Sequence, residues 1–231
     1  DETSGESTAW YAAFWGFCAE YLTVRFGTDW CLSPEQSASL LTGDWTVPKQ
    51  LLVRSSKGGN KPTPMPYGTS MFDLRLAIPP PADIDVRDGL RIFSLPAALI
   101  SCSASQYAAR PVEMRASLAM TQDASDILVR LLAGGHSKVA GRLAGAFRNI
   151  GRARIADEIV ATMQAAGYSI SETDPFEDSQ RVTFGVRDVS PHINRLKMKW
   201  AGMRVDVLRH FPRAPGVTKD PASYIKRIEE V

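Results

Sequence analysis

Cysteine and histidine, which most often ligate metals or act as nucleophile and base, are scarce in this chain. The 231 residues contain three of each, namely Cys18, Cys31, Cys102, His136, His192 and His210. The cysteines are odd in number and show no C-x-x-C spacing, which argues against a disulfide framework and a structural zinc site. We therefore expect a reducing, cytoplasmic compartment, with the histidines as surface or capping residues.

A strong net charge and a long apolar run are also missing. The 27 Lys and Arg residues against 25 Asp and Glu residues leave a formal charge of +2, which excludes a bulk polyanion binder and an acidic tail protein. The aromatic-rich stretch 9–26 is interrupted by Glu20 and Arg25, so we predict a helix that packs by an aromatic face and no membrane span. With 44% apolar residues, the chain can build a core.

Short motifs of known enzyme chemistry are absent as well. The sequence holds no G-x-S-x-G, H-E-x-x-H, G-x-x-x-x-G-K-[ST] or G-x-G-x-x-G pattern. One carboxylate pair, Asp83 and Asp85, lies two apart on a predicted strand and could hold Mg²⁺, although two solvated carboxylates beside a turn are the favoured alternative. We predict no catalytic, cofactor-binding or metal-binding residue in this chain.

Charge is distributed unevenly along the sequence. Residues 1–44 carry seven acids and one base, residues 127–154 carry six bases and no acid, and residues 192–213 carry six bases and one acid. Five bases gather around a turn between two predicted helices, namely Lys138, Arg142, Arg148, Arg152 and Arg154. They could contact nucleic-acid phosphates, bind a separate protein partner, or form a solvated or internally paired surface.

The hydrophobic pattern predicts an α+β fold, with a small antiparallel sheet over residues 47–94, covering helices, and a helical C-terminal part. Ser33 caps a helix that runs to about Thr42, and Asp88-Gly89 closes a hairpin. In the clearest strand, apolar residues such as Phe72 alternate with residues such as Asp73, which predicts one core face and one mixed outer face.

Helices are predicted to follow residue 95. Residues 137–166 should form a pair resembling a helix-turn-helix. Gly141 and Gly145 lie four apart on the first helix of that pair, so its backbone can approach a neighbour closely.

We expect four parts: an N-terminal aromatic helix (1–29), an α+β accessory domain (30–170), a linker (171–189), and a long helix with the start of a truncated helical domain (190–231). The apolar stripe over residues 193–211 could pair within the chain, with another domain, or with a second copy in a homodimer. The chain begins at Asp1 and ends inside a predicted helix, so we expect a fragment of a longer protein.

Several blocks resemble the region that precedes the catalytic domain in a group of bacterial Fic-family proteins. These blocks are residues 32–43, 48–53, 89–100, 131–152 and 190–195. Residues 30–166 are also similar in layout to the effector part of type IV abortive-infection (AbiEi-like) antitoxins.

The Fic family transfers AMP from ATP to protein hydroxyls and carries the motif H-x-F-x-[DE]-G-N-x-x-R. Nothing here matches it, since His210-Phe211 is not followed by Gly-Asn, and the family's inhibitory helix is absent too. The resemblance therefore implies a non-catalytic accessory domain that positions, regulates or recruits targets for an AMP-transfer domain outside this chain. ATP and Mg²⁺ are expected only in that domain. The alternative is a nucleic-acid-binding, antitoxin-like regulator that uses the basic helix pair 137–154.

Overall fold

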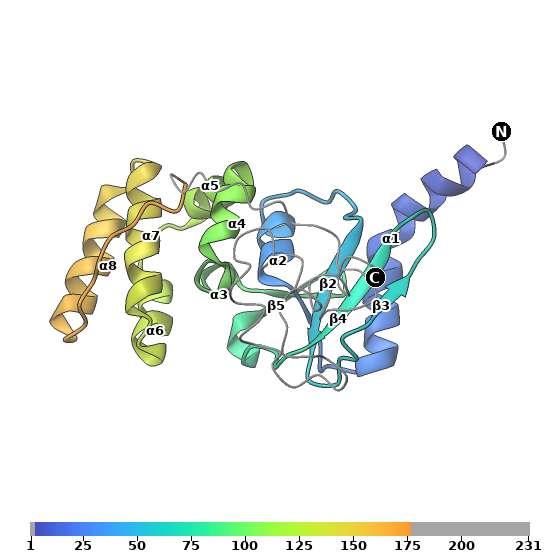
Figure 1. The fold of residues 1–231 in the computed structure, drawn as a ribbon, viewed down its shortest axis with the longest axis horizontal. Helices are drawn as coiled ribbons and strands as arrows, with labels where there is room; N and C mark the ends of the chain where they lie inside the picture. Colours follow the sequence, from blue (N-terminus) through green and yellow to red (C-terminus); the bar gives the residue numbers. More distant parts are fainter. Residues whose placement is uncertain (1–2, 177–231) are drawn as a thin grey trace, which may run out of the picture. The chain divides into compact units, whose positions relative to one another are not determined.

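The computed structural model describes residues 3–176, and predictions for residues 177–231, including the 193–211 stripe, lie outside the described residues. After α1 and α2, the strands of two small sheets come before the remaining helices (Figure 1), which confirms the α+β class. The elements are α1 (Thr3–Phe26), β1 (Cys31–Leu32), α2 (Pro34–Leu41), β2 (Gln50–Ser55), β3 (Pro62–Pro64), β4 (Ser70–Arg75), the 3₁₀ helix η1 (Pro81–Asp83), β5 (Ile84–Arg87), β6 (Leu90–Phe93), α3 (Leu95–Ser101), α4 (Ala104–Ala109), α5 (Pro111–Met120), α6 (Ser125–Gly134), α7 (Ser137–Asn149) and α8 (Ala153–Ala165).

The larger sheet is mixed rather than wholly antiparallel. Its strand order is β1-β2-β4-β3, and β2 pairs with β4 in parallel. After β2 the chain forms the edge strand β3, and β4 then lies between β2 and β3. It is antiparallel to β3 and therefore runs in the same direction as β2. The short edge strand β3 contains Pro62 and Pro64, and proline, which has no N–H to donate, is tolerated at a sheet edge.

The predicted outer face of β4 is wrong. Met71, Phe72 and Asp73 are all buried, with Asp73 only 1% exposed. Met71 belongs to the same core cluster as Leu51 of β2 and Leu22 of α1, so the side of the sheet expected to be mixed carries apolar packing. Because β4 lies between two other strands and both of its faces are covered, simple alternation does not describe it.

The second sheet is the predicted hairpin of β5 and β6. Arg87 pairs with Leu90 across a two-residue turn, in which Asp88 has φ 48° and Gly89 has φ 78°. Positive φ at both central residues defines a type I′ turn. The twist of this turn matches the twist of the two strands, and Asp-Gly adopts it readily. The prediction from the Asp-Gly pair is confirmed.

The helix α1 docks on the sheet as expected, by one face of its apolar side chains. Phe14, Cys18 and Leu22 are fully buried, whereas Tyr11 and Phe17 are 44% and 41% exposed. Thus only some of the aromatic side chains of α1 are buried in the core. Among the described helices, none combines the length and apolarity needed to cross a membrane.

Candidate functional site

The predicted basic helix pair forms, with α7 and α8 packed side by side (Figure 1). Gly151, with φ 77°, makes the tight turn between them. The five basic residues that the sequence brought together do not form one free surface, because each meets a different environment.

Arg142 points inward. Its Nη2 donates to the backbone oxygens of Ile100, at 3.3 Å, and Cys102, at 2.7 Å, and its guanidinium lies 5.6 Å from the Tyr107 ring centroid. The Tyr107 hydroxyl in turn donates to Leu99 O at 2.9 Å. Arg142 therefore fastens α7 to the end of α3 through Nη2, while its Nε is buried without a hydrogen-bond partner, so the guanidinium is turned toward the interior rather than toward a phosphate in solvent.

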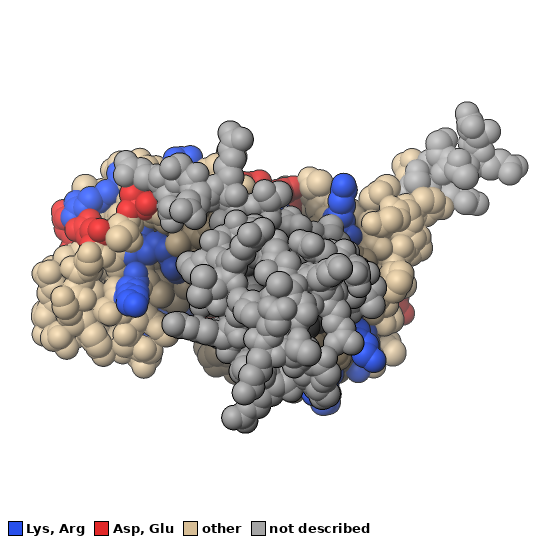
Figure 2. Space-filling model, viewed as in Figure 1, with Lys and Arg blue, Asp and Glu red and all other residues tan. Residues whose placement is uncertain are grey.

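Arg148 and Arg152 are also engaged within the protein. Arg148 donates from Nε to Glu172 Oε2 and from Nη2 to Asp157 Oδ1, both at 2.6 Å. The hydrogen bond to Glu172, and to a smaller extent the one to Asp157, raises the pKa of Arg148 above its ordinary value. Arg152 donates to Thr121 O. Figure 2 shows positive and negative side chains adjoining in this helical region.

Lys138 and Arg154 keep more of their charge in solvent. Lys138 is exposed at the start of α7, and the Arg154 side chain is 74% exposed, with Glu158 Oε2 at 3.6 Å. Arg154 also donates to Gln122 O at 3.5 Å. Four of the five predicted residues thus have partners within the protein, and Lys138 and Arg154 are the ones most open to solvent.

The glycine pair on α7 receives a close neighbour, as predicted. The neighbour is the extended segment 168–176, here called the strap, and Thr173 N donates to Gly141 O at 3.3 Å. A Cβ on Gly141 or Gly145 would lie closer than 3.0 Å to backbone atoms of the strap. Only glycine at these two positions lets the strap backbone lie against the helix backbone.

Side-chain contacts hold the second half of the strap, residues 172–176. Asn149 Nδ2 donates to Asp174 Oδ2 at 2.8 Å, next to the Arg148–Glu172 pair. At its end, the Phe176 ring lies 5.7 Å from the Tyr107 ring and 4.3 Å from the Arg115 guanidinium. A hydrogen bond and an ion pair therefore hold residues 172–174 against α7, and ring and cation–ring contacts hold Phe176 against α4 and α5.

The carboxylates weighed as a magnesium site are separated by structure. Asp83 ends η1 and Asp85 lies exposed on β5, so the prediction that both share a strand face is wrong. Arg130 Nε lies 2.5 Å from Asp83 Oδ1 and pairs with it. Within residues 3–176, no group of three or more His, Cys, Asp and Glu side chains could hold a metal ion.

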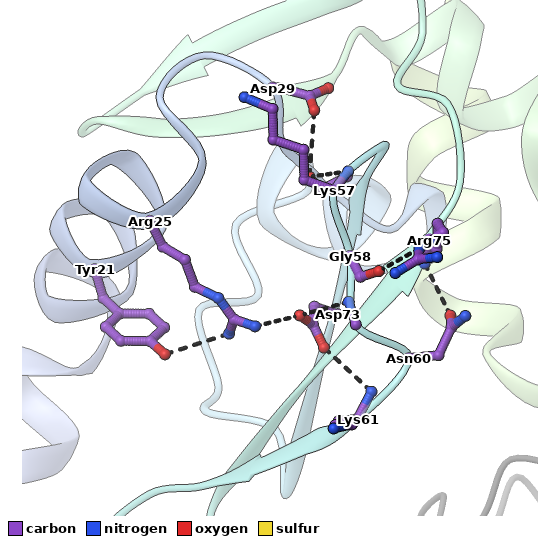
Figure 3. Close-up of polar contacts among 11 residues, drawn as sticks. Tyr21, Arg25, Asp29, Lys57, Gly58, Asn60, Lys61, Asp73 and Arg75 are labelled. Carbon is purple, nitrogen blue, oxygen red and sulfur yellow. Dashed lines mark hydrogen bonds and ion pairs between the residues drawn. The ribbon is translucent and has the colours of Figure 1, made fainter.

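A charged cluster that sequence reasoning missed lies around Asp73 (Figure 3). The buried carboxylate accepts hydrogen bonds from Arg25 Nη2 at 2.6 Å, Gly59 N at 3.0 Å and Lys61 N at 3.3 Å. Gly58 packs so tightly that a Cβ there would lie 2.6 Å from Leu74 O. The signal in the sequence was a lone acid inside an apolar strand; the Gly58-Gly59 loop that it binds lies 14 residues earlier in the chain.

The loop held by Asp73 presents cations. Lys57, Lys61 and Arg75 are exposed around it. Arg75 is fixed by its Nε, which donates to Gly58 O at 2.7 Å, and by its backbone N, which donates to Asn60 Oδ1 at 2.9 Å. Residues 45–82 contain five bases and the single acid Asp73, a charge run that the sequence analysis passed over.

The three thiols are buried. Burial raises the pKa of Cys18 and of Cys31 to about 12 and raises that of Cys102 as well. A thiol that stays protonated is a poor nucleophile, so these groups behave as core side chains.

No protein-family model, curated protein or solved structure matches this chain.

Proposed function

We propose that this chain is a non-catalytic accessory region of a bacterial, cytoplasmic Fic-type protein. It positions or regulates an AMP-transfer domain outside these residues, or recruits the protein whose hydroxyl receives AMP. ATP and Mg²⁺ then belong to that domain, and its partners are the domain itself and a protein target. The proposal rests on the block resemblance and on one structural observation, the strap.

The strap supports a positioning role because it fixes the place where the chain leaves the described body. It lies on the α7 backbone at two glycines, is paired through Glu172 to Arg148, and ends with Phe176 packed on Tyr107. A flexible tether would need none of these contacts. A fastened last segment gives the end of the described body a fixed place, which is what an accessory region needs in order to orient a catalytic partner.

The same geometry bears on the antitoxin-like alternative. Arg142, Arg148 and Arg152 hold α3, the strap and the α5–α6 connection, respectively. Each of these arginines has a partner within the protein, so the helix pair offers phosphates fewer free cations than its sequence suggests, and the antitoxin-like alternative has the weaker support.

The first experiment uses the 231-residue chain with ATP, Mg²⁺ and bacterial protein fractions, followed by intact-mass and peptide mass spectrometry. The expected result is that no AMP is added to any hydroxyl. AMP transfer by these residues alone would overturn the proposal.

A second experiment tests positioning in the longer protein that carries the AMP-transfer domain. Gly145→Ala pushes the strap from α7, whereas Gly16→Ala, with no atom within 4 Å of the added Cβ, is the matched control. We expect Gly145→Ala to change the rate or the site of AMP transfer and Gly16→Ala to leave both as in the parent protein. Equal labelling by both variants contradicts a positioning role.

A further inference from the structure

Aromatic side chains of α1 gather beside the connection between β3 and β4. Near one end of α1, Trp10 Nε1 donates to Thr69 Oγ1 at 3.3 Å and the Tyr11 hydroxyl donates to Tyr67 O at 3.4 Å. At the other end, Arg25 pairs with Asp73 of β4. With both ends attached in this way, α1 lies against the β3–β4 connection and β4.

Several rings along this line are open to solvent. Phe17 and Tyr21 stack with an interplanar angle of 16° and centroids 5.8 Å apart, and the Trp10 ring lies 5.2 Å from Phe17. Tyr11, Phe17 and Tyr67 are each more than 40% exposed. We call Trp10, Tyr11, Phe17, Tyr21 and Tyr67 the aromatic row.

Cations gather at the Asp73 end of the row, on the loop shown in Figure 3. We call Arg25, Lys57, Lys61 and Arg75 the basic end. Residues 8–27 and 45–82 together contain six bases and two acids, Glu20 and Asp73. Asp73 is buried and paired. The other acid at this loop is Asp29, which accepts a hydrogen bond from the Ser56 hydroxyl beside Lys57 (Figure 3), so the cations Lys61 and Arg75 lie farther along the loop from it. The hydrogen bonds to Asp73 and Asn60 hold the loop in one conformation, which lowers the entropy lost on binding.

We propose that the aromatic row and the basic end bind single-stranded nucleic acid without strong sequence preference. Exposed rings offer faces on which unpaired bases stack, and lysines beside them attract the phosphate backbone. A duplex hides its base faces, so it uses the cations but not the rings. This surface differs from the α7–α8 pair and does not depend on the accessory function proposed above.

The edge strand itself argues against a peptide occupant. Pro62 and Pro64 of β3 have no N–H groups, so an added strand could not form a regular ladder there. An acidic protein segment would pair with the lysines but would make no use of the exposed ring surface of the row. The combination of rings and cations is satisfied best by a flexible polyanion that carries flat bases.

The test measures fluorescence anisotropy of labelled 20-nucleotide oligo-dT, the matching duplex and a polyglutamate peptide with the 231-residue chain. We expect the single strand to bind most tightly, with affinity that falls as salt rises. Lys57→Ala with Lys61→Ala should weaken binding about tenfold. Phe17→Ala, and separately Tyr67→Ala, should weaken it by about tenfold as well, because each removes a stacking partner.

The matched control removes the same charge elsewhere, with Lys138→Ala and Arg154→Ala on the α7–α8 pair, and should leave the affinity unchanged. Circular dichroism and urea unfolding identify any variant that fails to fold, and Phe17→Leu then replaces Phe17→Ala. Three results overturn the proposal: absent binding at low salt, equal effects of the two double variants, and equal or tighter binding of the duplex or polyglutamate.

Discussion

Gly145→Ala tests whether α7 holds the strap by backbone contact. The added Cβ would lie 2.5 Å from the Thr173 carbonyl carbon, against 3.4–4 Å for an ordinary contact. The strap backbone would have to retreat by about 1 Å, and forcing extra atoms into a tight contact costs about 1–3 kcal/mol. Alanine also favours helix over glycine by about 1 kcal/mol.

These two effects act on different parts of the molecule. The alanine strengthens α7, while the clash removes the Thr173 N–H hydrogen bond to Gly141 O, 3.3 Å long and worth about 1 kcal/mol. We therefore expect the strap to detach while the body remains folded, so that global unfolding free energy changes by no more than about 1–2 kcal/mol.

Hydrogen exchange measured by mass spectrometry or NMR reports the outcome. The Thr173 amide should exchange at least about tenfold faster in Gly145→Ala, as expected when about 1.4 kcal/mol of local protection is lost. Gly16→Ala should leave its exchange unchanged and raise the unfolding free energy by up to about 1 kcal/mol. If Gly145→Ala behaves like Gly16→Ala, the backbone contact does not exist as described.

Asp73→Asn should lower the unfolding free energy by roughly 1.5–3 kcal/mol in urea titrations, because charge-assisted hydrogen bonds are lost while the volume is kept; an unchanged midpoint would refute its anchoring role. Gly89→Ala should cost about 1 kcal/mol in the same assay, since φ is 78° there and an L side chain is strained. Cys18, Cys31 and Cys102 should not react with a thiol reagent at pH 8 until the chain is unfolded. Their raised pKa values mean that the folded thiols keep protons that the unfolded thiols, with pKa near 9.0, release. Stability should therefore fall between about pH 9 and 12, by up to about 1.4 kcal/mol per pH unit for each thiol; a flat profile there would show that the thiols are accessible.

Features set by a few neighbouring residues were predictable. Ser33 caps α2 with its Oγ accepting from Gln36 N, Pro34 occupies the first turn, and Gly135 ends α6 with φ 61°. In each case the local backbone conformation allows few residue types, so the residue type reveals the conformation. The close approach at Gly141 followed from the same kind of argument.

Features set by distant partners were not predictable. Whether Arg142 faces water or Cys102 O depends on where α3 packs, and the exposure of Lys57 depends on how Asp73 folds the neighbouring loop. Counting charges along the chain reveals neither the position of α3 nor the conformation of that loop. For this reason the five bases that looked like one site proved to have separate environments, and a second basic region was overlooked.

By itself, the sequence determined the α+β class, the order of the helices and the hairpin turn, because capping, glycine conformation and hydrophobic period act over a few residues. Only the tertiary structure decided that β2 and β4 are parallel, that Asp73 is buried against Arg25, and that the strap covers the glycines of α7. Those outcomes depend on which segments pack together in space. Burial and charge pairing act between residues that are neighbours in the fold but far apart in the sequence.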